Sequence, residues 1–301
     1  MPCYYPLRAF QTYQADPHTG KTSVQFRRHR NAPDREIDLP CGKCYGCRLE
    51  RSRQWAVRCM HEASMHEDNC FLTLTYDDAH LPRGGTLVKT HFPAFMKRLR
   101  SHVKRECDPS PPPKIKYFHA GEYGPETCRP HYHALLFNID FGDKVLKTYR
   151  GSHPVYTSEL LDRLWSHGNC EIGSVTFDSA GYVARYILEK VTGPIAEKWY
   201  DGLEPEYATM SRRPSIGAEW YAKYGKEVYP DDRVIVKNKP QLPPRAYDRL
   251  LQDAEPDVYE RIKKRRERSK NPEDSTADRL MVREECAKAR LKLFSNQRSE
   301  P

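Results

Sequence analysis

The sequence has no long apolar run, and none of its hydrophobic stretches approaches the ~18 residues that a membrane-spanning helix requires. Its first residues, Met1–Pro6, lack the apolar core of a signal peptide, which predicts that the protein is not secreted. Because disulfides are rare outside oxidising compartments, the ten cysteines are expected to be reduced thiols or metal ligands. We find no internal repeat. These absences predict a cytoplasmic protein without a membrane partner.

The composition is that of a basic protein. Of its 301 residues 30% are charged and 38% hydrophobic, which allows one substantial core with smaller appendages. The net charge of +9 fits a polyanionic partner, although many basic proteins never contact nucleic acid. The distribution is more informative, since Lys and Arg recur in 48–58, 97–105 and 261–270 with aromatic residues common between them. The basic run 261–266 can neutralise phosphates, or it can be an ordinary solvated helix face.

The order of the expected elements predicts an α+β fold. Residues 1–48 are Cys-rich with little periodicity, and from about Lys198 aromatic residues lie among Arg, Lys and Pro. Between them, periodicity predicts helices from Leu49, over 92–103, over 160–165 and over 181–190, and strands over 71–76, 115–122, 131–139 and 172–177. We therefore expect a central antiparallel sheet flanked by helices. The predicted domains are 1–48, 49–196 and 197–301, the last being a basic extension that ends in a helical tail.

Two histidines begin an apolar strand. Side chains alternate along a strand, so His131 and His133 point to the same side while Tyr132 points to the other. Glu122 ends the preceding strand and can lie across the hairpin from them. Two imidazoles and a carboxylate predict a site for Mg²⁺ or Mn²⁺ that leaves positions open for a phosphate oxygen. Glu122 can also be an ordinary hairpin-edge charge, and alternation places His119 on the opposite side.

A second pattern is a pair of tyrosines on a predicted helix. Tyr182, Tyr186 and Lys190 lie four residues apart and share one face. The neighbouring line of Val183, Ile187 and Val191 can pack the helix onto a sheet. Two tyrosines beside an apolar stripe are usually packing residues. Together with the histidine pair, however, they indicate nucleophiles that attack a phosphodiester, with Lys190 as a candidate helper.

The cysteines Cys41, Cys44 and Cys47 stand at metal-ligand spacing, and structural zinc takes four ligands. We choose Cys3 as the fourth, with Cys59 or His61 as alternatives. Zinc would supply a core to a segment that has little apolar periodicity. The alternative is that these cysteines are unligated thiols in a tight turn.

Five segments resemble, in order, one known family. Residues 71–76, 130–133 and 182–186 look like the three motifs of HUH endonucleases that start rolling-circle replication, and residues 41–48 and 210–214 resemble the gokushovirus branch of the microviruses. The resemblance implies an HUH-type sheet that carries His131 and His133, and a tyrosine helix beside the metal. It also implies that Tyr182 and Tyr186 nick single-stranded DNA at the viral origin, form a 5′-phosphotyrosine link and later rejoin strands. A host helicase and polymerase would act in the host bacterial cytoplasm.

Two other functions remain open. The protein can be a non-catalytic, zinc-containing DNA-binding protein, or a metal phosphoesterase that activates water and uses the tyrosines as substrate clamps. A metal-dependent nicking-joining enzyme differs from both because it forms a protein–DNA adduct that survives denaturation.

Overall fold

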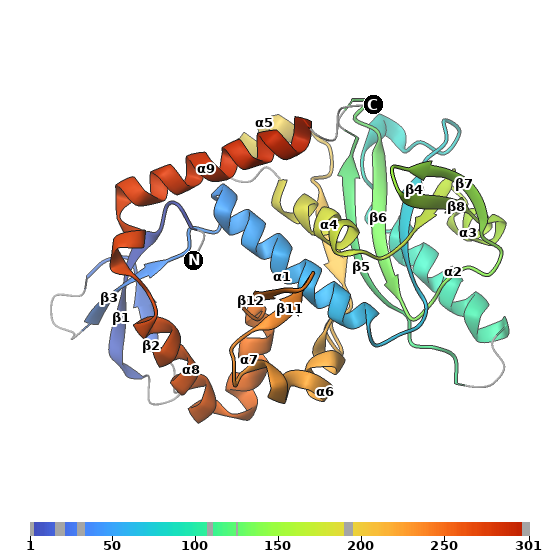
Figure 1. Ribbon diagram of the computed structural model, residues 1–301. Helices are drawn as coiled ribbons and strands as arrows, with labels where there is room; N and C mark the ends of the chain where they lie inside the picture. The colour runs from blue at the N-terminus through green and yellow to red at the C-terminus, as the bar shows by residue number, and fades with distance from the viewer. Residues whose placement is uncertain are drawn as a thin grey trace. The chain divides into compact units, whose positions relative to one another are not determined.

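The computed structural model describes residues 3–15, 22–28, 34–106, 111–124, 126–189 and 195–296 (Figure 1). The chain forms two compact units, one of residues 1–51 with 265–301 and the other of residues 52–264. The domain limits at residues 48 and 196 remain a prediction.

The larger unit is built on a seven-stranded antiparallel sheet. Its strands follow the order β10 (Tyr207–Met210), β5 (Lys116–Tyr123), β6 (Pro130–Phe137), β4 (Asn69–Thr75), β9 (Cys170–Gly173), β8 (His153–Thr157) and β7 (Val145–Arg150). The α+β prediction is confirmed. Strand β10 comes from the segment predicted as a separate C-terminal region, yet it pairs with β5 at the edge of the sheet.

Helices cover both faces of this sheet (Figure 1). One face packs on α2 (His91–Glu106) and α3 (Glu159–Trp165), with a core that includes Leu72, Leu74, Phe95, Tyr132 and Trp165. The other face packs on α4 (Phe177–Glu189) and on the part of α1 (Tyr45–Ala63) beyond residue 51. Its core includes Ala56, Phe118, Leu135, Phe137 and Val183. Tyr132 is fully buried in the core under α2, so it points away from the two histidines, as the strand alternation predicts.

The central hairpin of β5 and β6 is confirmed. Its register places Glu122 opposite His131 and Ala120 opposite His133. The strand predicted over 172–177 is wrong at its end, because β9 stops at Gly173 and Phe177 already begins α4. A reciprocal cap starts this helix. Thr176 Oγ1 accepts from Ser179 N at 3.0 Å, and Ser179 Oγ accepts from Thr176 N at 2.8 Å.

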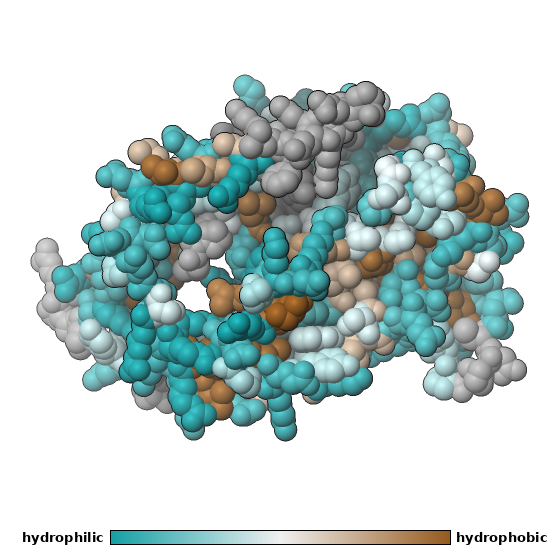
Figure 2. Space-filling view, viewed as in Figure 1, coloured by the Kyte–Doolittle hydropathy of each residue, from teal (hydrophilic) through white to brown (hydrophobic). Residues whose placement is uncertain are grey.

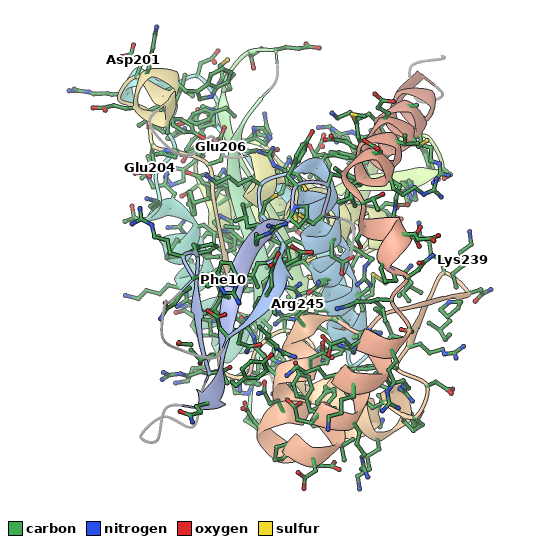
Figure 3. The ribbon with its side chains drawn as sticks, turned by 90° about the vertical axis from the view of Figure 1, so that its left-hand side faces the viewer. Phe10, Asp201, Glu204, Glu206, Lys239 and Arg245 are labelled. Carbon is green, nitrogen blue, oxygen red and sulfur yellow. The ribbon has the colours of Figure 1, made fainter. Side chains whose placement is uncertain are left out.

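The larger unit has a third apolar cluster around Tyr247 and Leu251, to which α6 (Ala218–Val228), β11 (Val234–Val236), α7 (Arg245–Ala254) and α8 (Pro256–Arg268) contribute. The last residues of α8 belong to the smaller unit. The elements of the larger unit that are not yet named are η1 (Arg83–Gly85), α5 (Ile195–Tyr200), which Asp201 follows, and β12 (Lys239–Gln241). Asp201, Lys239 and Arg245 are labelled in Figure 3.

The smaller unit holds a three-stranded sheet in the order β2 (Thr22–Gln25), β1 (Leu7–Ala15), β3 (Asp34–Leu39), with Phe10 on the middle strand (Figure 3). It also contains η2 (Pro272–Ser275) and α9 (Ala277–Asn296). These strands have no counterpart among the elements predicted from the sequence. Among the described residues of this unit, the buried apolar side chains are Cys3, Ala9 and Leu280, a very small core.

The face of the molecule shown in Figure 2 is predominantly polar. Hydrophilic side chains cover most of the face in Figure 2, and the apolar patches between them are separate. None of the helices in the described part of the chain combines the length and apolar character that a bilayer crossing requires.

Candidate metal centre and tyrosine helix

The structure brings Glu122, His131 and His133 together on the α4 side of the sheet. One carboxylate oxygen, Glu122 Oε1, lies 2.6 Å from His131 Nε2 and 2.9 Å from His133 Nε2. The strand alternation positions all three, because even-numbered residues of β5 and odd-numbered residues of β6 point to the same side of the antiparallel pair. The ligand atoms of the three residues lie within 4.8 Å of one another.

The other ring nitrogen of each histidine has a partner of its own. His131 Nδ1 lies 3.2 Å from the carbonyl oxygen of Arg129, to which it donates, and His133 Nδ1 lies 3.1 Å from Thr73 Oγ1. Such contacts fix the ring orientation and leave both Nε2 atoms facing the carboxylate. The sequence analysis did not single out Thr73. Its place on β4, directly opposite His133 in the register, is the signal that would have found it.

Burial makes this cluster a pre-formed site. The side chain of Glu122 is 2% exposed, and those of His133 and His131 are 7% and 17% exposed. Burial raises the pKa of Glu122, but hydrogen bonds from His131 and His133 outweigh this effect, so its pKa lies below the usual value. Burial lowers the pKa of His133, even though the neighbouring carboxylate raises it. An ionised carboxylate and a neutral imidazole are the protonation states that metal ligation requires.

A divalent cation fits this donor set. The second oxygen of Glu122, Oε2, is buried and has no hydrogen-bond partner among the described residues. Two imidazole nitrogens and a carboxylate suit Mn²⁺, and Mg²⁺ through the oxygen. A buried acceptor without a partner is costly in a protein that never binds a cation there.

Tyr182 lies directly beside the histidines. Its ring meets the His133 ring edge to face, with centroids 5.1 Å apart and planes at 81°. Its side chain is 37% exposed, whereas the next residue, Val183, is fully buried against the sheet. Helix α4 thus packs through one line of residues and presents a phenol on the next, as its spacing predicted. The side chain of Tyr186, the end of the apolar line (Ile187 and Val191) and all of Lys190 lie outside the described residues.

Two cations flank the same side of the sheet, and sequence reasoning missed them. Glu171, opposite Thr73 on β9, lies 3.1 Å from Lys147 Nζ and 2.6 Å from Arg150 Nη2, both on the edge strand β7. Every residue of β7 is exposed, so no apolar pattern marks this strand. Together with Glu171 the two cations carry one net positive charge, and Arg150 lies close enough to His133 to lower the pKa of that imidazole.

His119 lies on the opposite face of β5. It is buried against Phe92, with ring centroids 3.6 Å apart, and its Nδ1 lies 3.0 Å from Thr209 Oγ1. Burial lowers its pKa to about 3, so the ring is neutral. It therefore belongs to the core and not to the cluster of Glu122, His131 and His133, which we call the candidate metal cluster.

A second cluster joins Cys3, Cys41, Cys44 and Cys47 in the smaller unit, with the four sulfur atoms within 4.8 Å of one another. Backbone N–H groups point at the sulfurs: Cys41 N lies 3.3 Å from Cys3 Sγ, Cys44 N 3.3 Å from Cys41 Sγ and Cys47 N 3.5 Å from Cys44 Sγ. Burial raises the pKa of the Cys44 thiol, but hydrogen bonds from neighbouring backbone N–H groups outweigh it and lower the pKa to about 7.

The two alternative fourth ligands belong to the larger unit and have other contacts. Cys59 is fully buried in the core against the sheet. His61 stacks on Trp220 with centroids 3.5 Å apart, and its Nδ1 lies 2.9 Å from the hydroxyl of Tyr247. Of the three candidates, Cys3 is therefore the one that the fold places beside Cys41, Cys44 and Cys47.

The chain is similar to known replication-associated proteins. Residues 69–191, which carry the candidate metal cluster and the tyrosine helix, match the family model "Replication-associated protein ORF2/G2P". The chain is 41% identical over 225 residues to the replication-associated protein VP4 of Bdellovibrio phage phiMH2K, covering 73% of this chain and 70% of that protein. It is 30% identical over 293 residues to the replication-associated protein ORF2 of Spiroplasma virus 4, covering 89% and 86%.

A third relative is the replication-associated protein ORF4 of Chlamydia phage 1, 32% identical over 240 residues and covered over 58% of its own length. No solved structure matches the chain.

Proposed function

The chain belongs to the family of phage replication-associated proteins, and from this premise we propose that it initiates replication by nicking single-stranded DNA at the viral origin. The observation that carries the proposal is the contact between Tyr182 and His133, because it places a phenol beside a buried pair of imidazoles with a carboxylate. The sheet and its helices are then an HUH-type endonuclease fold.

Different side chains would bind the metal, attract the DNA backbone and attack the phosphorus. Glu122, His131 and His133 would hold Mg²⁺ or Mn²⁺, which polarises a nonbridging phosphate oxygen and orients the scissile bond. Lys147 and Arg150 favour an anionic backbone on the same side of the sheet. The Tyr182 hydroxyl attacks phosphorus and loses its proton. The bond between phosphorus and the 3′ oxygen breaks, and this oxygen takes up a proton and leaves as a 3′-hydroxyl.

The product would be a 5′-phosphotyrosine link and a free 3′-hydroxyl that can prime synthesis. In the two-tyrosine scheme, the second hydroxyl, assigned to Tyr186, cuts the regenerated origin, and the 3′-hydroxyl released there seals the circle. Lys190 stays a candidate helper. The partners in this scheme are single-stranded origin DNA and the host helicase and polymerase, and the place is the cytoplasm of the bacterial host.

The cysteine cluster supports a second part of the proposal, a structural zinc. Four thiolates with backbone N–H groups aimed at them are the donor set of a closed tetrahedral site. The buried apolar side chains described in that unit are Cys3, Ala9 and Leu280, so hydrophobic burial contributes little to its stability. Zinc bound by the four cysteines would supply the stability that apolar burial does not provide in this unit.

The nicking reaction can be tested with labelled single-stranded origin DNA, Mn²⁺ and a denaturing gel. We expect wild type to form an adduct that survives denaturation, and the double variant Tyr182→Phe/Tyr186→Phe to form none. Tyr13→Phe is a matched control, because Tyr13 is an exposed tyrosine on β1. It should react like wild type.

The outcomes separate the three functions. Cleavage without an adduct would indicate a water-using phosphoesterase, and binding without cleavage would indicate a non-catalytic DNA-binding protein. Either result would refute the proposal. An adduct that persists in the double tyrosine variant would refute the assignment of the nucleophiles.

A further inference from the structure

A basic groove lies at the opposite end of β5 from the candidate metal cluster. It has a volume of about 470 Å³ and forms where the last turns of α2, the first residues of β5 and the segment after β10 meet. The cations that line it are Arg100, Lys104, Lys114, Lys116, Arg212 and Arg213. Segments distant in sequence thus place six positive side chains around one cavity.

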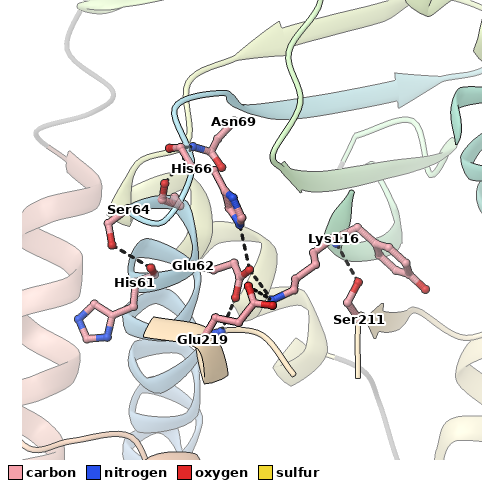
Figure 4. Close-up of polar contacts among 11 residues, drawn as sticks. His61, Glu62, Ser64, His66, Asn69, Lys116, Ser211 and Glu219 are labelled. Carbon is pink, nitrogen blue, oxygen red and sulfur yellow. Dashed lines mark hydrogen bonds and ion pairs between the residues drawn. The ribbon is translucent and has the colours of Figure 1, made fainter. Parts of the chain in front are cut away.

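One of these cations is neutralised by the protein. Lys116 is buried, and its Nζ lies 2.7 Å from Glu62 and 2.9 Å from Glu219 (Figure 4). His66 completes this cluster through Nε2, 3.2 Å from Glu62 Oε1. Although Glu62, His66 and Glu219 could hold a metal ion by spacing, the Lys116 ammonium already lies between the carboxylates.

The rim of the groove is different. Lys104, Lys114, Arg212 and Arg213 are exposed, and none pairs with a carboxylate in the part of the chain that the structure describes. Arg100 donates from Nη2 to the carbonyl oxygen of Ile115 at 3.2 Å, so its charge is also uncompensated. Five cations without a described counter-charge around one cavity favour an anionic ligand.

The fold holds the rim in place. Ser211 N donates to the carbonyl oxygen of Tyr117 at 2.9 Å, and Ser211 Oγ accepts from Tyr117 N at 3.1 Å (Figure 4). These two bonds extend the pairing of β10 with β5 up to the two arginines. Val103, Pro112, Pro113 and Ile115 line the same cavity and give the Lys and Arg stems apolar surface to lie on. Backbone hydrogen bonds and apolar contacts therefore hold the groove in a defined shape.

Its position relates it to the proposed cleavage site. Lys116 and Glu122 lie six residues apart on β5, which corresponds to about 20 Å along a strand. Helix α2, which lines the groove, covers the other face of the sheet from Glu122, so the path from the exposed rim to the cleavage site is longer than this. Duplex DNA that follows this path needs more than about six base pairs. We propose that the groove binds the phosphodiester backbone of the origin DNA more than about 20 Å from the scissile phosphate, round the end of the sheet. The assignment of that phosphate rests on the proposed function, whereas the anion site rests on the groove itself.

The test is the salt dependence of DNA binding, measured by fluorescence anisotropy without divalent ions. Lys104→Gln/Arg212→Gln removes two rim charges from two segments. Lys97→Gln/Lys226→Gln removes two exposed lysines of the same unit that do not line the groove. The probes are origin oligonucleotides with a four-nucleotide arm, a long single-stranded arm or a long duplex arm beside the cleavage position.

We expect the groove variant to reduce the slope of log K against log salt by about 1.4 for the single-stranded long arm or about 1.8 for the duplex arm. The long arm that shows the loss identifies the form of DNA in the groove. The short probe and the control variant should keep the wild-type slope. Unchanged slopes on both long probes, or an equal loss on the short probe or in the control variant, would overturn the proposal.

A charge-conserving variant separates charge from folding. Lys104→Arg/Arg212→Lys should keep the wild-type slope, and a loss as large as in the glutamine variant would contradict the proposal. Thermal melting of each variant verifies the fold. The binding assay involves no cleavage. Its result therefore stands even if the adduct assay shows that the protein does not nick DNA.

Discussion

The substitution Glu122→Gln should abolish tight binding of Mn²⁺ while leaving the fold intact. The change keeps the size of the side chain but removes the charge that lies 2.6 and 2.9 Å from the two imidazole nitrogens. Loss of a residue that only supports a metal ligand weakens metal binding by about 10–100-fold. Because Glu122 itself contributes a donor oxygen, we expect a loss of about 100-fold or more, or at least about 2.7 kcal/mol.

Isothermal titration calorimetry with Mn²⁺ measures this loss. Soft thiolates are poor ligands for Mn²⁺, so the cysteine cluster should not contribute to the signal. Glu204→Gln is a matched control. Glu204 lies in the segment before β10 (Figure 3), and its half-buried carboxylate pairs with Lys89. It should bind Mn²⁺ like wild type. Equal affinity of the Glu122→Gln variant and wild type would refute the metal assignment.

Three further predictions concern stability and zinc. Cys44→Ser should lower the bound zinc, measured by atomic emission, from about one ion per chain to none; retained zinc would contradict the cysteine site. Stability in urea should fall as the pH drops from 6.5 towards 3, because the native state keeps His119 neutral while the unfolded chain protonates it. His119 contributes at most about 1.4 kcal/mol per pH unit to this loss of stability. His119→Gln should therefore flatten the plot of stability against pH, and an unchanged plot would contradict the burial of a neutral imidazole as the cause. Tyr132→Phe should cost about 1–3 kcal/mol, since its hydroxyl bonds Tyr76 and both backbone groups of Val88, and a midpoint equal to that of wild type would exclude this.

The grouping of Glu122, His131 and His133 was predictable because side chains alternate strictly along a strand. Once 115–122 and 131–139 are paired as a hairpin, the period of two places Glu122 with the histidines and His119 on the other face. The tyrosine helix was predictable for the same kind of reason, since Val183 and its neighbour Tyr182 differ in burial as the helical period requires.

Other elements carry no such pattern. Strands β2 and β7 are exposed at every residue, so hydrophobic alternation cannot mark them. Strand β10 is defined by pairing with a strand about ninety residues earlier, which no local window can detect. The start of α4 did have a local signal, the Thr176–Ser179 cap, but the apolar residues before it were taken as a continued strand.

The most direct test of the proposed chemistry is mass spectrometry of the tryptic peptides of the DNA adduct. Trypsin cuts after Arg163, Arg185 and Lys190, so it separates Tyr182, in peptide 164–185, from Tyr186, in peptide 186–190. We expect a nucleotide phosphate on one of these two peptides, and on neither when Mn²⁺ is removed. A phosphate on any other peptide, or cleaved DNA with no modified peptide, would contradict this expectation.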